Sequence, residues 1–197
     1  PETVLLGYRA AARAAVAEGA EHRGLELLEG LHAVGISRRL PRLAIASLAD
    51  QVRMHARRFR AETCKALVAR INALLAGGDV PQGPLWWRSV EWMQHLAHAY
   101  AAIAAQDWRG ALEPLARAGA AAEAMSLGRV RIEVMAMRAL ALDRAGEKSL
   151  PLLREAMDLA ATYGLARLFV DAHPALGDLA RRLAETEAVS ASPDQGA

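Results

Sequence analysis

Residues 96–118 read LAHAYAAIAAQDWRGALEPLARA, a stretch in which alanine recurs at helical spacing. Three of its small residues, Ala99, Ala111 and Ala118, are separated by 12 and then by 7 positions. Two helices that cross closely need small side chains at the crossing point, because large side chains would hold the two axes apart. The stretch therefore predicts a helix pair joined by a short turn around Trp108.

The same spacing recurs along the chain. It is found at Ala12, Gly24 and Leu31, more loosely at Val52, Cys64 and Ile71, and with a shorter turn at Ala139, Ser149 and Ala156. The middle members follow one another at intervals of 40, 47 and 38 residues, and the longest interval contains the Gly/Pro-rich segment 77–84. This periodicity predicts an all-α, TPR-like superhelical array of about four helix pairs plus a C-terminal capping helix. The alternative is a helical bundle in which the alanine spacing arose by chance.

The expected helix boundaries follow from glycine and proline. Gly19 and Gly35 are predicted to end the first and second helices, and Pro41 suits the first turn of the third. Beyond segment 77–84, helices are predicted at 85–105, 109–124, 128–145, 148–163 and about 174–187. The repeat domain is predicted to cover residues 1–187. The polar segment 188–197 is predicted to be a flexible linker.

Composition narrows the function classes. The chain has 197 residues, of which 53% are hydrophobic and only 5% aromatic, so sheet-based folds are disfavoured. A single cysteine, Cys64, excludes an internal disulfide and favours a reduced, cytoplasmic setting. No apolar run is long enough to cross a bilayer, so no membrane role is expected.

The net charge of +2 is too small to indicate nucleic-acid binding by itself. Residues 38–70, however, hold nine Lys and Arg against two acidic residues. This segment is either a solvated basic helix face or a docking surface for an acidic partner or anionic ligand.

No catalytic constellation stands out, so we expect a protein that is not an enzyme and needs no cofactor. Nucleotide-binding glycine motifs are missing from the sequence. Glu91, His95 and His98 share a helix face, but they lack a clear further ligand, and no metal site is expected. Cys64 stands where the repeat requires a small buried residue, so a structural role is favoured over a nucleophilic one.

The repeat register also predicts which side chains face the concave groove of the array. They lie one residue after each crossing position and three before it. The candidate effector- or partner-binding residues from this rule are Arg9, Arg13, Arg53, Leu96 and Tyr100, and the rule also selects Ala136 and Leu140. Trp87 is added as a candidate because Trp86 and Trp87 adjoin at a helix start and cannot both face the same way. These tryptophans either pack within the repeats or form a stacking platform for a sugar-like or aromatic ligand. Such a groove would be cationic in its N-terminal half and apolar in its C-terminal half, and would suit an amphipathic anion or an acidic partner helix.

Four segments carry a resemblance to a known family. They are LGYRAAAR (residues 6–13), GISRRLPRL (35–43) continuing to Gln51-Val52-Arg53, RALALDRAG (138–146) and YGLARLFVD (163–171) followed by Pro174-Ala175-Leu176. In these segments the chain resembles the helical-repeat sensor region of MalT-like, LuxR-type transcriptional regulators. It departs from the usual pattern at His173, where glycine is common, and in the short turn after Gly146.

The resemblance implies a function. In that family the repeats lie between an ATP-binding domain and a C-terminal DNA-binding domain, so residues 188–197 would lead toward the latter. A small-molecule effector or protein partner bound to the repeats would control activation, without direct contact between this segment and nucleic acid. The alternative is a TPR-type protein-interaction scaffold that has no small-molecule ligand.

Overall fold

The computed structural model describes residues 2–78 and 80–191, and this part of the chain is all-helical, without strands. Its helices are α1 (Glu2–Ala17), α2 (Glu21–Ser37), α3 (Pro41–Ala56), α4 (Ala61–Ala76), α5 (Pro84–Ala104), α6 (Leu112–Ala124), α7 (Gly128–Arg144), α8 (Leu150–Thr162), α9 (Arg167–Ala172) and α10 (Ala175–Ala191). None of these helices is long and apolar enough to span a membrane.

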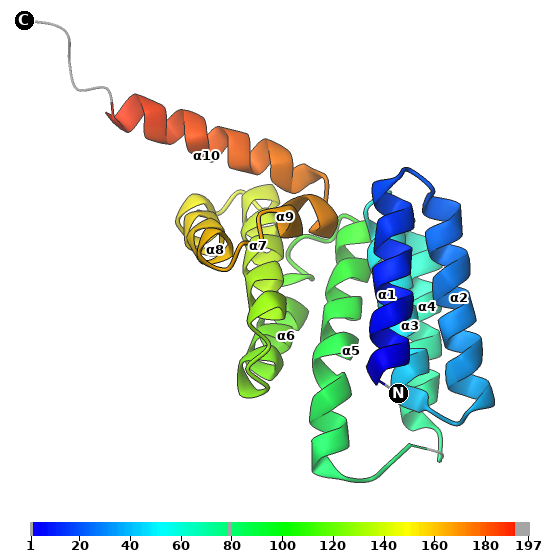
Figure 1. The fold of residues 1–197 in the computed structure, drawn as a ribbon. Helices are drawn as coiled ribbons and strands as arrows, with labels where there is room; N and C mark the ends of the chain where they lie inside the picture. Colours follow the sequence, from blue (N-terminus) through cyan, green and yellow to red (C-terminus); the bar gives the residue numbers. More distant parts are fainter. Residues whose placement is uncertain (1, 79, 192–197) are drawn as a thin grey trace, which may run out of the picture.

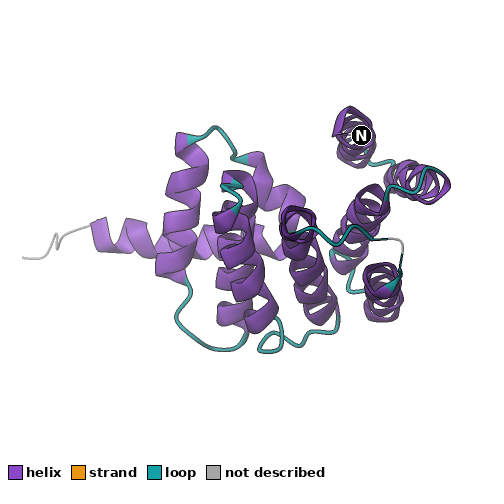
Figure 2. Ribbon diagram, turned by 90° about the horizontal axis from the view of Figure 1, so that it is seen from below, coloured by secondary structure: helices purple, strands orange, loops and turns teal. Residues whose placement is uncertain are grey.

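The first eight helices form four consecutive pairs, α1/α2, α3/α4, α5/α6 and α7/α8 (Figure 1). The second helix of each pair packs on the first helix of the next pair, and α3 also packs directly on α5. Seen nearly end-on, the N-terminal helices follow a curved row (Figure 2). The helix α10 packs on α7, α8 and α9 and then extends away from the array. The predicted all-α helical repeat array is therefore confirmed.

Small residues lie where the paired helices cross, as the spacing predicts. A Cβ atom placed on Gly24 would be 3.2 Å from the carbonyl oxygen of Ala12. In the second pair, the Cys64 thiol lies 3.5 Å from the carbonyl oxygen of Val52. The other predicted crossing residues, Ala99, Ala111, Ala139 and Ser149, are all buried. The resulting stack shares one continuous apolar core that runs from Leu5 to Leu183.

The turns after the helices share one pattern of backbone hydrogen bonds. At seven helix ends a backbone N–H donates to the carbonyl five residues earlier, from Ala20 to Ala15, Leu40 to Gly35, Arg60 to His55, Asp107 to Ala102, Leu127 to Ala122, Glu147 to Leu142 and Leu165 to Ala160. The residue before each donor has a positive φ; three of these residues are glycines and four are Arg39, Phe59, Gln106 and Ser126. This is the Schellman arrangement, which satisfies the last carbonyls of a helix and reverses the chain. The sequence did not show it, because four of the seven positions lack the usual glycine.

Gly35 corrects one prediction. It does not end the second helix, because α2 continues to Ser37. A Cβ atom on Gly35 would lie only 2.6 Å from the backbone nitrogen of Ala44 in α3. Gly35 is therefore the point where the backbones of two successive helices touch.

Other boundaries also differ from the predictions. The helices α6 and α8 begin at Leu112 and Leu150, later than expected, and the short helix α9 was not predicted. At the C-terminus, α10 runs through Ala191, so residues 188–191 are helical rather than the start of a linker. The rest of the predicted linker, residues 192–197, lies outside the described residues.

We predict opposite effects for alanine at two helical glycines. Gly35→Ala should lower the free energy of unfolding by about 1–3 kcal/mol, because the new methyl group meets the α3 backbone. Gly7→Ala, at a helical position with open space around it, should raise it by up to about 1 kcal/mol through helix propensity. Urea unfolding followed by circular dichroism measures both. Equal effects of the two substitutions would contradict the close approach at Gly35.

Candidate functional site

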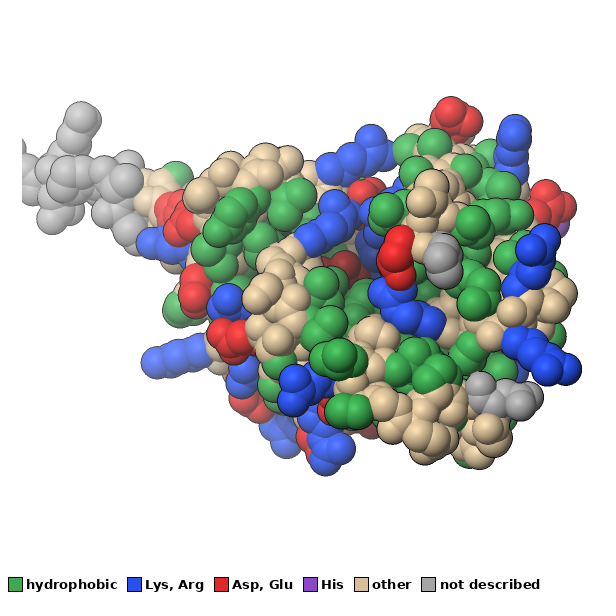
Figure 3. All heavy atoms as spheres, turned by 60° about the horizontal axis from the view of Figure 1, so that its bottom comes forward, with side chains coloured by type: hydrophobic (Ala, Val, Ile, Leu, Met, Phe, Trp, Pro, Cys, Tyr) green, Lys and Arg blue, Asp and Glu red, His purple; other side chains and the backbone are tan. Residues whose placement is uncertain are grey.

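A cleft of about 680 Å³ lies on the inner side of the array, between the first helices of the four pairs. Because α3 and α5 pack on each other, they form its floor. The helix α1, which packs mainly on α2, forms one wall, and the start of α7 with residues 126–127 forms the other. From below, the molecule has a recess with acidic and basic side chains at its back and apolar side chains around it (Figure 3).

Five of the six candidate residues line this cleft together. Arg9 and Arg13 come from α1, Arg53 from α3, and Leu96 and Tyr100 from α5. Their common placement follows from the helix-pair register, because each lies one residue after a crossing position or three before it. Whether these residues bind an effector remains a prediction.

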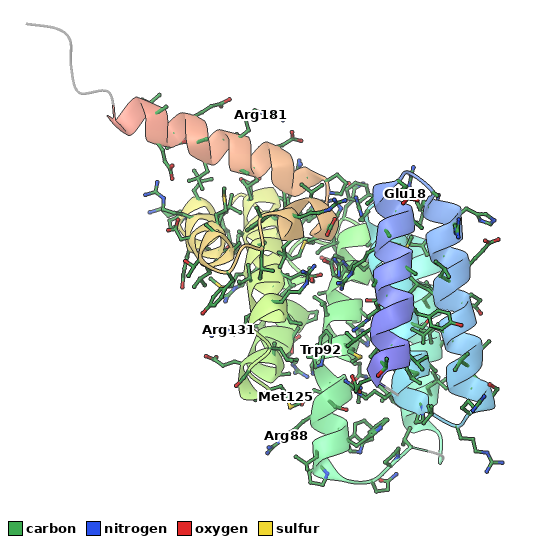
Figure 4. The ribbon with its side chains drawn as sticks, in the orientation of Figure 1. Glu18, Arg88, Trp92, Met125, Arg131 and Arg181 are labelled. Carbon is green, nitrogen blue, oxygen red and sulfur yellow. The ribbon has the colours of Figure 1, made fainter. Side chains whose placement is uncertain are left out.

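Trp87 does not line the cleft. It is half-buried near the start of α5, with its ring edge-on to Trp86 at a centroid distance of 5.4 Å. The tryptophan that lines the cleft is Trp92, on the lower half of α5 (Figure 4). A sequence signal for it exists, because Trp92 precedes Leu96 by four residues and so shares its helix face.

The register rule fails on α7. Ala136 and Leu140 are fully buried and line no part of the cleft, because neighbouring helices, including α9, cover this part of α7. The residues of α7 that do line it are Gly128, Arg129, Val130 and Glu133. The C-terminal side of the groove is therefore charged as well as apolar, which corrects the predicted division into a cationic and an apolar half.

Ion pairs join the walls of the cleft to its floor. Arg9 of α1 binds Asp50 of α3, with nitrogen–oxygen distances of 2.5 and 3.2 Å. Arg42 of α3 pairs with Glu2 of α1. Both ion pairs are partly exposed, so solvent screens part of their attraction. They connect α1 to α3, and direct packing between these two helices is sparse.

A buried polar network crosses from the floor to the α7 wall. The Tyr100 hydroxyl donates to Oε1 of Glu133 at 2.7 Å, and Nε of Arg53 lies 3.4 Å from the same oxygen. Burial would lower the pKa of Arg53, but the neighbouring Glu133 and Tyr100 outweigh it and raise that pKa. Burial, together with Glu133, raises the pKa of Tyr100 well above its ordinary value, so its hydroxyl stays a donor at neutral pH.

Two of the arginines that line the cleft have no carboxylate partner among the described residues. Five arginines and three carboxylates line it, and Arg9, Arg42 and Arg53 each pair with a carboxylate. The structure gives Arg13 and Arg129 no ion pair or side-chain hydrogen bond with any described residue. Burial, followed by the positive charge of Arg53, lowers the pKa of Arg13; Asp50 opposes this shift, and Arg129 and Arg9 add to it. The cleft therefore carries unneutralised positive charge.

Toward α9 the cleft narrows. A small recess of about 50 Å³ continues from it and shares Arg9, Arg13, Asp50 and Arg53 with it. Asp171 of α9 also lines this recess, so α9 restricts the groove at that end. The recess in turn shares Val16, Met54 and Arg57 with a further cavity of about 290 Å³, so it is a constriction in the groove.

The other residues that could bind a metal or act as a nucleophile make structural contacts instead. No group of three or more His, Cys, Asp or Glu in the described residues is arranged to hold a metal. His95 lies 3.8 Å from Glu91, whereas His98 contacts Asn72 at 3.3 Å. Burial raises the pKa of the Cys64 thiol to about 11, which makes it a poor nucleophile.

His173, where the chain departs from the family pattern, is buried between the array and α10. Its Nδ1 accepts the N–H of Ala175 at 3.1 Å, and its ring meets the edge of Phe59 at a centroid distance of 5.3 Å. Burial lowers its pKa to about 4. The neutral ring therefore caps the start of α10 against the α3–α4 turn.

Comparisons of the chain with protein-family models, curated proteins and solved structures gave no significant match. The fold and the site alone define the class, which is a helical-repeat protein whose concave side holds a cationic, partly apolar cleft.

We predict that Tyr100→Phe destabilises the protein. Loss of a buried hydrogen bond to a carboxylate should reduce the free energy of unfolding by about 1.5–3 kcal/mol. The matched control is Tyr163→Phe, because Tyr163 is 66% exposed and should change stability by less than about 0.5 kcal/mol. Denaturant unfolding of both variants checks the prediction, and equal stabilities would contradict the buried network.

Proposed function

We propose that this chain is the effector-sensing helical-repeat region of a MalT-like, LuxR-type transcriptional regulator. The observation that carries the proposal is the cleft of about 680 Å³ on the inner face, which gathers Arg9, Arg13, Arg53, Leu96 and Tyr100. Its volume falls in the range of small-molecule sites, about 300–1,000 Å³, and it combines apolar surface with a few converging polar groups. The family resemblance of the sequence supports the same assignment.

The cleft favours a small effector over an extended peptide. A peptide lying along a solenoid groove needs a continuous channel, and here the groove falls from about 680 Å³ to about 50 Å³ beside Asp171 before it widens again. The alternative function, a scaffold that binds only proteins, would therefore have to use another surface or only the wide part of the cleft.

Sensing would act through the position of α1. This helix is held to the floor of the cleft by side-chain ion pairs more than by direct packing. An effector that touches both walls would stabilise conformations with one spacing between α1 and α7. The shift in the populations of these conformations would change the surface that a neighbouring domain contacts. In the regulator we propose, the chain would work in the cytoplasm, between its nucleotide-binding and DNA-binding domains.

We predict that at least one compound in a broad metabolite panel raises the melting temperature of the chain. A ligand at 100 times its Kd adds about 2.7 kcal/mol of stability, which thermal-shift fluorimetry detects readily. Ala10→Trp should abolish the shift, because Ala10 is an exposed residue that lines the cleft and tryptophan would fill it.

The control is Ala11→Trp, at an adjacent exposed position of α1 that does not line the cleft. It should keep the full shift. A panel without any stabilising compound, or a shift that survives Ala10→Trp, would contradict the proposed function.

A further inference from the structure

We propose that the effector is a small amphipathic acid, whose anionic head lies between Arg13 and Arg129 and whose apolar part lies against Trp92 and Leu96. The inference rests on the proposed function and adds the chemical class of the ligand.

The anionic head follows from the charge balance of the cleft. Each carboxylate that lines it is already bound by an arginine from another helix. Arg13 on α1 and Arg129 on α7 have no such partner among the described residues and stand on opposite walls. Arg129 is among the positive charges that lower the pKa of Arg13, against the opposing effect of Asp50. A carboxylate or phosphate between them would relieve this repulsion and could accept paired N–H bonds from each planar guanidinium.

The apolar part follows from the floor and rim. Along α5, the buried residues Met93, Leu96 and Ala97 form an apolar floor, and the half-buried Trp92 extends it. On the facing wall Leu6 is 64% exposed although it lines the cleft. Large apolar side chains that remain exposed around a concave site are typical of a surface that a ligand covers.

The same residues argue against polyanions. A nucleic-acid backbone or a strongly acidic peptide would place repeated negative charges near Glu2, Asp50 and Glu133, which also line the cleft. Among the described arginines that line the cleft, only Arg13 and Arg129 have no carboxylate partner to leave before they could neutralise these charges. One anionic group on an apolar body is the charge pattern that fits.

Matched acids and amides test the proposal directly. Octanoate and phenylacetate are titrated against the chain in thermal-shift assays at constant ionic strength, beside octanamide and phenylacetamide. At least one acid should bind about tenfold more tightly than its amide, because only the acid carries the charge that the free arginines require. Equal binding of acids and amides, or no binding of either acid, would overturn the proposal.

Arginine variants locate the head group. Arg13→Gln and Arg129→Gln should each weaken the bound acid at least about tenfold and leave amide binding unchanged. Arg23→Gln, which removes an exposed arginine of α2 outside the cleft, should leave acid binding as it is. Acid binding that survives both variants would overturn the assignment.

The two proposals fail in different ways. If neutral metabolites stabilise the wild type and Ala11→Trp but not Ala10→Trp, the cleft is an effector site and the acidic class is wrong. If an acidic peptide binds the wild type and neither acid does, the small-ligand inference is overturned in favour of a protein partner.

Discussion

The structure depends on the close approach of helix axes at small side chains. Where α1 meets α2, the position of Gly24 leaves little room above the Ala12 carbonyl, and where α2 meets α3, Gly35 touches the backbone of Ala44. Larger residues at these points would separate the axes and expose the apolar faces between them. Because a single helix pair cannot bury both of its faces, the stack forms only when each pair fits the next.

The cleft is a consequence of how that packing is distributed. The helices α3 and α5 pack closely on each other and fill the middle of the concave side. The helix α1 packs mainly on α2, and α7 packs mainly on α6 and α8, so a space remains between α1 and α7. Polar contacts then hold the walls in place, with Arg9 bound to Asp50 on one side and Glu133 bound to Tyr100 on the other. Three carboxylates are used in this way, and the cleft keeps the positive charge of the two arginines without a carboxylate partner among the described residues.

Much of this could be predicted from sequence, because one spacing rule fixes both the crossings and the faces of the helices. Arg9, Arg13, Arg53, Leu96 and Tyr100 were placed by that rule. The rule missed Arg129 and Glu133 because it selected Ala136 and Leu140, which lie further along α7 and are covered by neighbouring helices. The turn conformation could not be predicted for another reason. Arg39, Phe59, Gln106 and Ser126 have a positive φ, a left-handed backbone conformation that is expected mainly of glycine. Trp87 was chosen because it adjoins Trp86 at a helix start, and that position does not indicate how two adjacent tryptophans pack.

The most direct test of this account is the unfolding free energy of Ala99→Leu, measured in guanidinium chloride beside Ala116→Leu. Ala99 is fully buried at the crossing of the third helix pair, and Ala116 is exposed on the partner helix α6. The account predicts that Ala99→Leu loses about 1–3 kcal/mol and that Ala116→Leu stays within about 0.5 kcal/mol of the wild type. If leucine at position 99 is tolerated as well as leucine at 116, close axis contact at small residues is not what holds the array together.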